Sequence, residues 1–257
     1  MGIAGAGLSS VIAEIVSTVF FVVYTSYQNS YKLFGLNRLV GFDIHQLTKI
    51  LKIASPVMIQ FTISFGGWFV FFMMIEKMGE IPLAVSNVVR TFYLVALLPL
   101  WGYAAVTNTL VSNKIGANQI DEIKWIVLKI LKLSFLSILL LVLLLNIFSQ
   151  QYFSIFTNNS IVVKESIPVV IVVSISSILM SVSIFLFIII SGSGKTTVNL
   201  IIEFILMASY ILWTYLNVYI WHSSIVSVWV AEIIYSLEMG IFALFYLKYG
   251  DWKTSKV

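Results

Sequence analysis

The sequence predicts an all-α, polytopic membrane protein with seven transmembrane helices, its N-terminus outside the cell and its C-terminus in the cytoplasm. Three observations predict this class. Hydrophobic residues make up 60% of the 257-residue chain and charged residues 10%, and the mean hydropathy is +1.02, whereas soluble domains hold about 45–50% apolar and about 25% charged residues. Seven apolar runs are long enough to cross a membrane, and basic residues gather in alternate gaps between them. The composition excludes a water-soluble fold.

Each run is predicted as a helix, because crossing a core of about 30 Å takes about 20 apolar residues and lipid offers the backbone no outside hydrogen-bond partner. The predicted spans are 3–24, 53–75, 82–112, 125–148, 166–190, 196–220 and 222–247. Pro56, Pro82 and Pro168 are expected in the first turn of a span, where a missing N–H costs little. Pro99 falls inside the third span and predicts a kink there.

The longest polar stretch, residues 26–52, joins the first two spans. It predicts a cytoplasmic linker that ends in an amphipathic helix at the membrane surface, because apolar residues recur near its end at helical spacing. These residues are Phe42, Ile44, Leu47, Ile50 and Leu51. At the other end of the chain, residues 249–257 are predicted to form a cytoplasmic tail.

The predicted orientation follows from the positive charge, since cytoplasmic loops accumulate Lys and Arg. Of the 15 basic residues, Arg90 lies inside a span and two, Lys77 and Lys164, lie in the gaps assigned to the outside. The other twelve lie on the side assigned to the cytoplasm, and they are Lys32, Arg38, Lys49, Lys52, Lys114, Lys124, Lys129, Lys132, Lys195, Lys248, Lys253 and Lys256. The net charge of +4 is therefore explained by topology, and it calls for no nucleic-acid partner. We expect a multi-pass protein of the lipid bilayer, in the plasma membrane of a bacterium.

Several site classes are not predicted. The chain has no cysteine, and His45 and His222 are far apart in sequence and topology, so no metal site and no cofactor are expected. The segment Ser191–Thr197 resembles the end of a nucleotide-binding P-loop, but Ile189 stands where that loop needs its first glycine. Because the segment also follows a membrane span rather than a strand, it predicts a tight turn and no nucleotide partner. No catalytic motif indicates an enzyme.

Five ionisable residues lie within the predicted spans, where each costs at least about 2.5–3.5 kcal/mol at the membrane centre and needs a partner or a wet cavity. They are Glu14, Arg90, Glu203, Glu232 and Glu238; Lys129 and Lys132, just inside the cytoplasmic end of the fourth span, are counted with the cytoplasmic charges. Buried carboxylates that bind H⁺ or Na⁺ couple substrate movement to an ion gradient in transporters. The ion-coupling or transport candidates are Glu14, Glu203, Glu232 and Arg90. The alternative is structural: Arg90 neutralises a glutamate and holds helices together.

Polar residues on the same helix faces extend these positions into stripes. Glu14 shares a face with Ser10 and Thr18, and Glu232 has Tyr235 beside it. The candidates for lining a polar cavity are Ser64, Asn87, Asn199, Tyr210, Thr214 and Asn217. Glu238 points about 120° away from Glu232 on an ideal helix, so these two do not form a ready dyad.

A series of short motifs resembles the second half of the MATE (multidrug and toxic compound extrusion) transporter family, from its sixth to its twelfth helix. The matching segments are Gly5–Glu14, Ala54–Pro56, Ile75–Glu80, Ser86–Arg90, Val111–Gly116 and Ser191–Thr196. Each motif alone is weak, and their order and spacing across nearly the whole chain carry the resemblance.

The resemblance implies an exporter that exchanges small organic, often cationic, compounds for Na⁺ or H⁺ by rocking two six-helix lobes around a cleft. Residues 1–25 would be the last helix of the N-terminal lobe and residues 53–248 the C-terminal lobe. The rest of the N-terminal lobe is then expected in cis or in a partner chain. Many members carry an acid where Ser64 stands and another in the tenth helix, whereas this chain has none between Glu165 and Glu203. The usual cation site is therefore not implied.

Two other classes stay open. A lipid-linked oligosaccharide flippase of the same superfamily would need a broad basic cavity, and apart from Lys129 and Lys132 near the end of the fourth span, Arg90 is the basic residue that the predicted spans offer. A seven-helix receptor-like protein matches the helix count and orientation. A retinal-type receptor, however, needs a lysine in the middle of its last span, and Lys248 lies at the very end.

Overall fold

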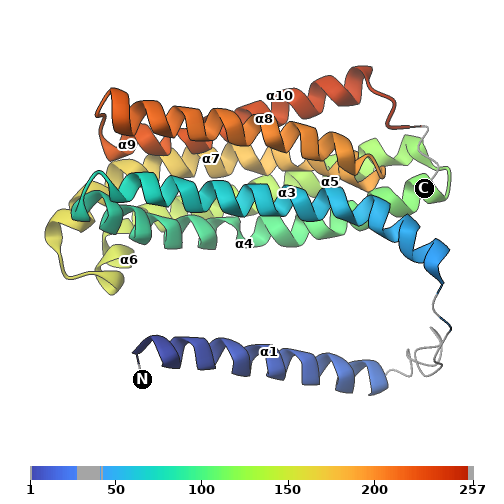
Figure 1. Ribbon diagram of the computed structural model, residues 1–257, viewed down its shortest axis with the longest axis horizontal. Helices are drawn as coiled ribbons and strands as arrows, with labels where there is room; N and C mark the ends of the chain where they lie inside the picture. Colours follow the sequence, from blue (N-terminus) through green and yellow to red (C-terminus); the bar gives the residue numbers. More distant parts are fainter. Residues whose placement is uncertain (1, 28–40, 42, 254–257) are drawn as a thin grey trace. The chain divides into compact units, whose positions relative to one another are not determined.

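The computed structural model describes residues 2–27, 41 and 43–253 (Figure 1). The chain divides into two compact units, Met1–Thr48 and Lys49–Val257. In the first unit, helix α1 (Gly2–Tyr27) is long enough and apolar enough to span a membrane and confirms the first predicted span. The predicted linker residues 28–40 and Phe42 lie outside the described residues.

Six further membrane-length helical segments confirm the remaining predicted spans. They are α3 (Ile44–Glu76), α4 (Glu80–Gly116), α5 (Ile120–Ile147), α7 (Ser160–Gly192), α8 (Thr196–Tyr215) continued by the π-helix η1 (Leu216–Ile220), and α9 (Ile225–Trp229) with α10 (Ala231–Tyr249). The last span is thus divided near Val230, a break that periodicity did not predict. A short helix, α6 (Ser149–Phe156), precedes α7 and was not predicted either.

Helix starts differ from the predicted ones in two places. The amphipathic segment before the second span is continuous with α3, so Pro56 lies well inside that helix rather than in its first turn. Pro168 likewise lies inside α7, because α7 already begins at Ser160, where the Asn159 side chain accepts a hydrogen bond from the N–H of Ile161 (3.0 Å). Pro82 does occupy the first turn of α4, and α4 continues helically through Pro99.

Two short turns depend on glycine. Gly79 between α3 and α4 has a φ of 112°, and Gly194 between α7 and α8 has a φ of 78°. Other residue types rarely adopt these backbone conformations, because a Cβ collides with the backbone. The turn predicted at residues 191–197 is therefore present, and it joins two adjacent helices.

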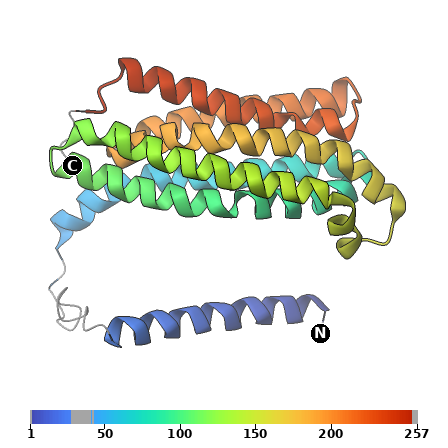
Figure 2. The ribbon, with the colours of Figure 1, turned by 180° about the vertical axis from the view of Figure 1, so that it is seen from behind.

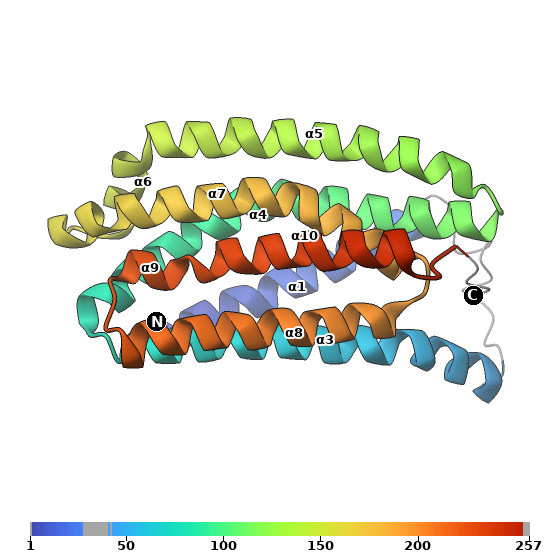
Figure 3. The same ribbon diagram turned by 90° about the horizontal axis from the view of Figure 1, so that it is seen from above.

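Helix α7 is the central helix of the second unit and packs against α4, α5 and α10 (Figures 2 and 3). Within its most apolar window 61% of the residues are buried, compared with 17% in α3. Serines allow close helix packing in a membrane, and α7 carries buried ones at several levels, including Ser176 and Ser183. Opposite Ser183, Gly240 of α10 leaves no room for a side chain: a Cβ there would lie 2.7 Å from the serine hydroxyl.

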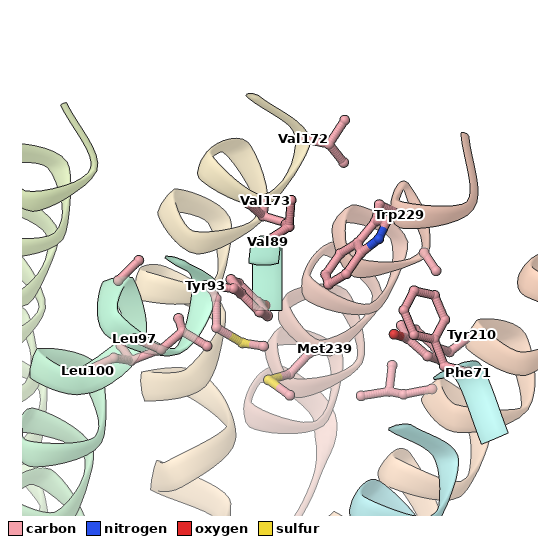
Figure 4. Close-up of a cluster of buried hydrophobic side chains, with 14 of the residues drawn as sticks. Phe71, Val89, Tyr93, Leu97, Leu100, Val172, Val173, Tyr210, Trp229 and Met239 are labelled. Atoms are coloured by element: carbon pink, nitrogen blue, oxygen red, sulfur yellow. The ribbon is translucent and has the colours of Figure 1, made fainter. Parts of the chain in front are cut away.

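Helix α3 is attached differently. Among the described residues, the backbone of α3 does not pack closely along the backbone of any other helix. Buried aromatic rings fill the space: Phe71 lies 5.2 Å from the ring of Tyr210 and 5.2 Å from that of Trp229, centroid to centroid (Figure 4). The position of α3 therefore depends on side chains such as Phe71, which reach toward α8 and α9.

Candidate functional site

Glu232 accepts hydrogen bonds from three different side chains. It lies in the first turn of α10 and is 4% exposed. Its Oε1 accepts hydrogen bonds from the Trp68 indole Nε1 (3.0 Å) and the Tyr210 hydroxyl (2.9 Å), and its Oε2 accepts one from the Tyr93 hydroxyl (2.9 Å). The three donors come from α3, α8 and α4, so one carboxylate joins four helices.

The backbone of Glu232 is held as well. Its carbonyl oxygen accepts hydrogen bonds from the hydroxyls of Ser176 on α7 (3.0 Å) and Ser236 on α10 (2.8 Å). The Ser176 hydroxyl also lies 3.4 Å from that of Tyr93. The central helix α7 thereby helps to fix both the acid and one of its donors.

Glu203 forms a second centre, on α8. Its side chain is fully buried, and its Oε1 lies 2.5 Å from the hydroxyl of Ser64 on α3. The Tyr235 hydroxyl of α10 lies 3.0 Å from Oε1 and 2.9 Å from Oε2 and donates to the carboxylate. Ser64 lies one helical turn before Trp68, so consecutive turns of α3 contact the two acids.

The two centres are built reciprocally. The acid on α8 binds a tyrosine of α10, and the acid on α10 binds a tyrosine of α8. The rings of Tyr210 and Tyr235 lie 6.1 Å apart with their planes at 79°. This edge-to-face geometry is a favourable one for aromatic pairs. We call Ser64, Trp68, Tyr93, Glu203, Tyr210, Glu232 and Tyr235 the carboxylate cluster.

Every side-chain partner that the structure describes for these two acids is neutral. Hydroxyl and indole groups supply the hydrogen bonds, and no Lys, Arg or His among the described residues pairs with either acid. Intramembrane acids are costly, and packed neutral donors offset that cost without supplying an opposite charge. The described residues thus place no opposite charge beside either acid.

The other candidate residues lie outside this cluster. Arg90 is half-buried on α4 and places its guanidinium carbon 5.0 Å from the centroid of the Phe72 ring, a cation–π contact with α3. Arg90 forms no ion pair with any described residue. The ion pair that the described structure contains joins Lys114 and Glu122 (2.7 Å). Glu238 accepts a hydrogen bond from Ser209, a further link between α10 and α8. Glu14 is exposed on α1, in the first unit.

The predicted cavity-lining residues are divided between several environments. Ser64 and Tyr210 belong to the carboxylate cluster. Asn87 is exposed and donates to the carbonyl of Leu83 in its own helix (3.1 Å). Asn217 donates to Trp213 and accepts from Ser227 of α9 (2.6 Å). The remaining two are Thr214, which donates to its own helix, and Asn199, which donates to the Phe187 carbonyl and leaves its Oδ1 buried without a protein partner in the described structure.

Sequence reasoning missed Trp68 and Tyr93, and named Tyr235 only as a neighbour of Glu232. Trp68 and Tyr93 are 164 and 139 positions from Glu232. A helical wheel compares residues within one helix, so it cannot show such contacts. The available signal was chemical: a buried acid requires hydrogen-bond donors, and the tyrosines and tryptophans of the apolar helices are such donors.

A bundle of membrane-length helices that buries carboxylates among neutral donors is typical of membrane transport proteins. The MatE family model matches residues 56–218, well over half of the chain. The chain belongs to the MatE family, and the family and fold indicate a transporter role. It is an integral membrane protein.

The chain is similar in fold to solved MATE transporters. A mutant of the MATE transporter VcmN from Vibrio cholerae matches with a TM-score of 0.78 and 17% identity, covering 98% of this chain and 58% of that one. An outward-facing multidrug resistance MATE transporter of the MOP superfamily matches with a TM-score of 0.76 and 17% identity, covering 91% and 54%. The chain therefore spans little more than half the length of these transporters. No curated protein sequence matches it.

Proposed function

We propose that this chain supplies the C-terminal half of a secondary active exporter that expels small organic compounds, cationic ones among them, in exchange for H⁺. One observation carries the proposal: two buried acids with neutral partners connect α3 to α8 and α10. The occupancy of those acids then controls how firmly α3 is held. A preceding lobe, in cis or in a partner chain, completes the substrate cleft.

Glu203 is suited to bind and release a proton, because Ser64 can form a hydrogen bond with either the ionised or the protonated carboxyl group. A hydroxyl carries one proton, yet the Ser64 oxygen lies 2.5 Å from Glu203 Oε1 and 3.0 Å from the carbonyl of Gln60. With Glu203 ionised, Ser64 donates to the carboxylate. With Glu203 protonated, the acid donates to Ser64, and Ser64 donates to Gln60. Proton binding thus reverses one hydrogen bond between α3 and α8.

Glu232 suits Na⁺ less well than H⁺. A bound Na⁺ needs oxygen ligands around it, and the Trp68 indole offers an N–H donor and no acceptor. Ion entry would have to displace that donor from Oε1. This favours H⁺ over Na⁺ as the coupling ion, which the sequence left open.

The test is transport by the complete protein in everted membrane vesicles, with ethidium as the organic cation. In wild-type vesicles, addition of ethidium should dissipate a preformed proton gradient. Glu203→Gln should reduce this to the level of vesicles that lack the protein, because glutamine cannot exchange the proton. Glu238→Gln, the same change at an acid outside the cluster, is the matched control and should preserve the response.

Two results would contradict the proposal. Proton-coupled ethidium transport that survives both Glu203→Gln and Glu232→Gln would remove the acids from coupling. Transport that requires Na⁺ and ignores the proton gradient would replace H⁺ with Na⁺.

A further inference from the structure

A cavity of about 1280 Å³ opens at the end of the second unit where α4 ends and α8 begins. The residues that line it come from α3, α4, the α4–α5 turn with the start of α5, the α7–α8 turn with the start of α8, and the C-terminal segment. No lining residue belongs to the carboxylate cluster. Figure 1 shows the start of α3, the end of α4 and the start of α8 at this same end. We call it the basic-end cavity, because Lys114, Lys195, Lys248 and Lys253 lie at these helix ends.

The α7–α8 turn gives the cavity a polar wall. Thr196, the first residue of α8, lines the cavity and is 3% exposed, and its hydroxyl has no hydrogen-bond partner among the described residues. Ser191 lines the same wall, and its hydroxyl also has no hydrogen-bond partner among the described residues. Helix α8 begins without a side-chain cap. Its first N–H groups therefore retain their capacity to bind an anion.

The charge on the cavity lining is positive. Lys253 is the charged residue that lines the cavity in the described structure, and no acid lines it there. Lys195 immediately precedes the first turn of α8. A helix N-terminus, the hydroxyl of a largely buried threonine and a lysine without a lining acid together favour an anionic group.

The opposite wall is apolar and extends along α3. Ile53, Val57 and Phe61 are among the residues of α3 that line it, spaced at one face of the helix from Ile50 to Phe61. This stripe covers about 16 Å at 1.5 Å per residue. The polar lining residues lie on α4, in the two turns, at the start of α8 and in the C-terminal segment, whereas every lining residue of α3 is apolar. A polar side next to an apolar stripe suits a phospholipid, whose charged headgroup lies at the surface and whose acyl chains run into the membrane.

We propose that the basic-end cavity binds one anionic phospholipid, with its phosphate at the start of α8 near Thr196 and Lys253 and an acyl chain along the α3 stripe. The positive-inside rule predicts this end to be cytoplasmic, and the cytoplasmic leaflet carries the anionic lipids. The site also accounts for the P-loop-like segment, because Ser191, Gly194 and Thr196 line the phosphate end. A nucleotide or free phosphate would leave the apolar stripe unoccupied.

The experiment is native mass spectrometry of the purified full-length chain, titrated with phosphatidylglycerol or phosphatidylcholine of the same acyl length. One phosphatidylglycerol should bind more tightly than phosphatidylcholine. Lys253→Glu should weaken that binding by about fivefold or more, the effect of one basic residue near a membrane surface. Thr196→Val, which removes the buried hydroxyl and keeps the shape, should weaken it as well.

Each variant has a matched control. Lys248→Glu makes the same charge change at the same end but outside the cavity lining, and Thr197→Val makes the same hydroxyl deletion at the exposed neighbouring position. Both should bind phosphatidylglycerol like the wild type. Equal effects in variants and controls would overturn the proposal, as would equal binding of the two lipids.

Competition separates the sources of phosphate. Displacement of phosphatidylglycerol by millimolar inorganic phosphate or ATP would overturn the lipid assignment in favour of a soluble anion. Persistence of the lipid in their presence would support it. The readout requires no transport, so its failure is independent of the proposed exporter activity.

Discussion

At the scale of single residues, the carboxylate cluster gives each acid several donors whose loss should be measurable. Sequence reasoning identified Glu203 and Glu232, because a charge in an apolar helix is visible in one helix alone. It did not identify which residues satisfy them. Those partners depend on how α3, α4, α8 and α10 pack, and no local pattern encodes that packing.

Tyr235→Phe removes a single hydroxyl that lies within 3.0 Å of both oxygens of Glu203. We expect the free energy of unfolding to fall by about 1.5–3 kcal/mol if Glu203 is ionised and by about 0.5–1.5 kcal/mol if it is neutral. Denaturant titration in detergent micelles at low and high pH measures the difference. Tyr249→Phe, at an exposed position of the same helix, should leave stability unchanged. A Tyr235→Phe effect no larger than this control would show that the bond contributes nothing.

Trp68→Phe keeps an aromatic ring beside Phe72 but removes the indole N–H that binds Glu232. Because Tyr210 and Tyr93 still donate to the acid, we expect a partial loss of about 1–3 kcal/mol in stability and not complete unfolding. Near-ultraviolet circular dichroism should show that the fold persists. A loss of the folded state would mean that Trp68 acts mainly through packing.

At the scale of helices, the position of α3 depends on side-chain contacts, and one of them places the side chain of Met207 on α8 against the backbone of Gly67. A Cβ at Gly67 would lie 1.9 Å from the Sδ of Met207, whereas Gly66 has nothing within 4 Å. The membrane-length helices were predictable from their apolar runs. The starts of α3 and α7 were not, because the helices extend beyond the apolar region into polar residues.

Gly67→Ala should push α3 away from α8 and lower stability by about 1–3 kcal/mol, the usual cost of overpacking. Gly66→Ala is the control and should be neutral or slightly stabilising, because alanine favours helix more than glycine does. Met207→Ala alone should also lower stability, because Met207 is buried, and the double variant Gly67→Ala with Met207→Ala should lose less than the two single losses added together, because the truncated side chain makes room for the new methyl group. Thermal unfolding of the wild type and the four variants gives the comparison, and additive losses would place the cause elsewhere.

At the scale of the whole molecule, orientation and completeness remain as predictions of the sequence. The chain has no cysteine, so single cysteines can be introduced without background. Asn158→Cys should react with a membrane-impermeant thiol reagent in intact cells, and Gln119→Cys should react only after permeabilisation. Both positions are exposed turns at opposite helix ends. The reverse labelling pattern would invert the topology.

The proposed second lobe makes a separate prediction about mass. The solved transporters are about 1.7 times as long as this chain. We therefore expect the natively tagged protein to migrate well above 28.9 kDa or to co-purify with a second multi-helix chain. An active, unaccompanied protein at 28.9 kDa would contradict the two-lobe proposal.

The sharing of Glu232 among four helices also bears on how this family can vary. A change at Trp68, Tyr93 or Tyr210 alone removes a donor that the buried acid uses, while loss of the acid leaves three donors unpaired. Single replacements should thus be selected against, and accepted ones should occur together. In an alignment of close homologues, these four columns should co-vary, and relatives that lack the acid should have replaced the donors with apolar residues.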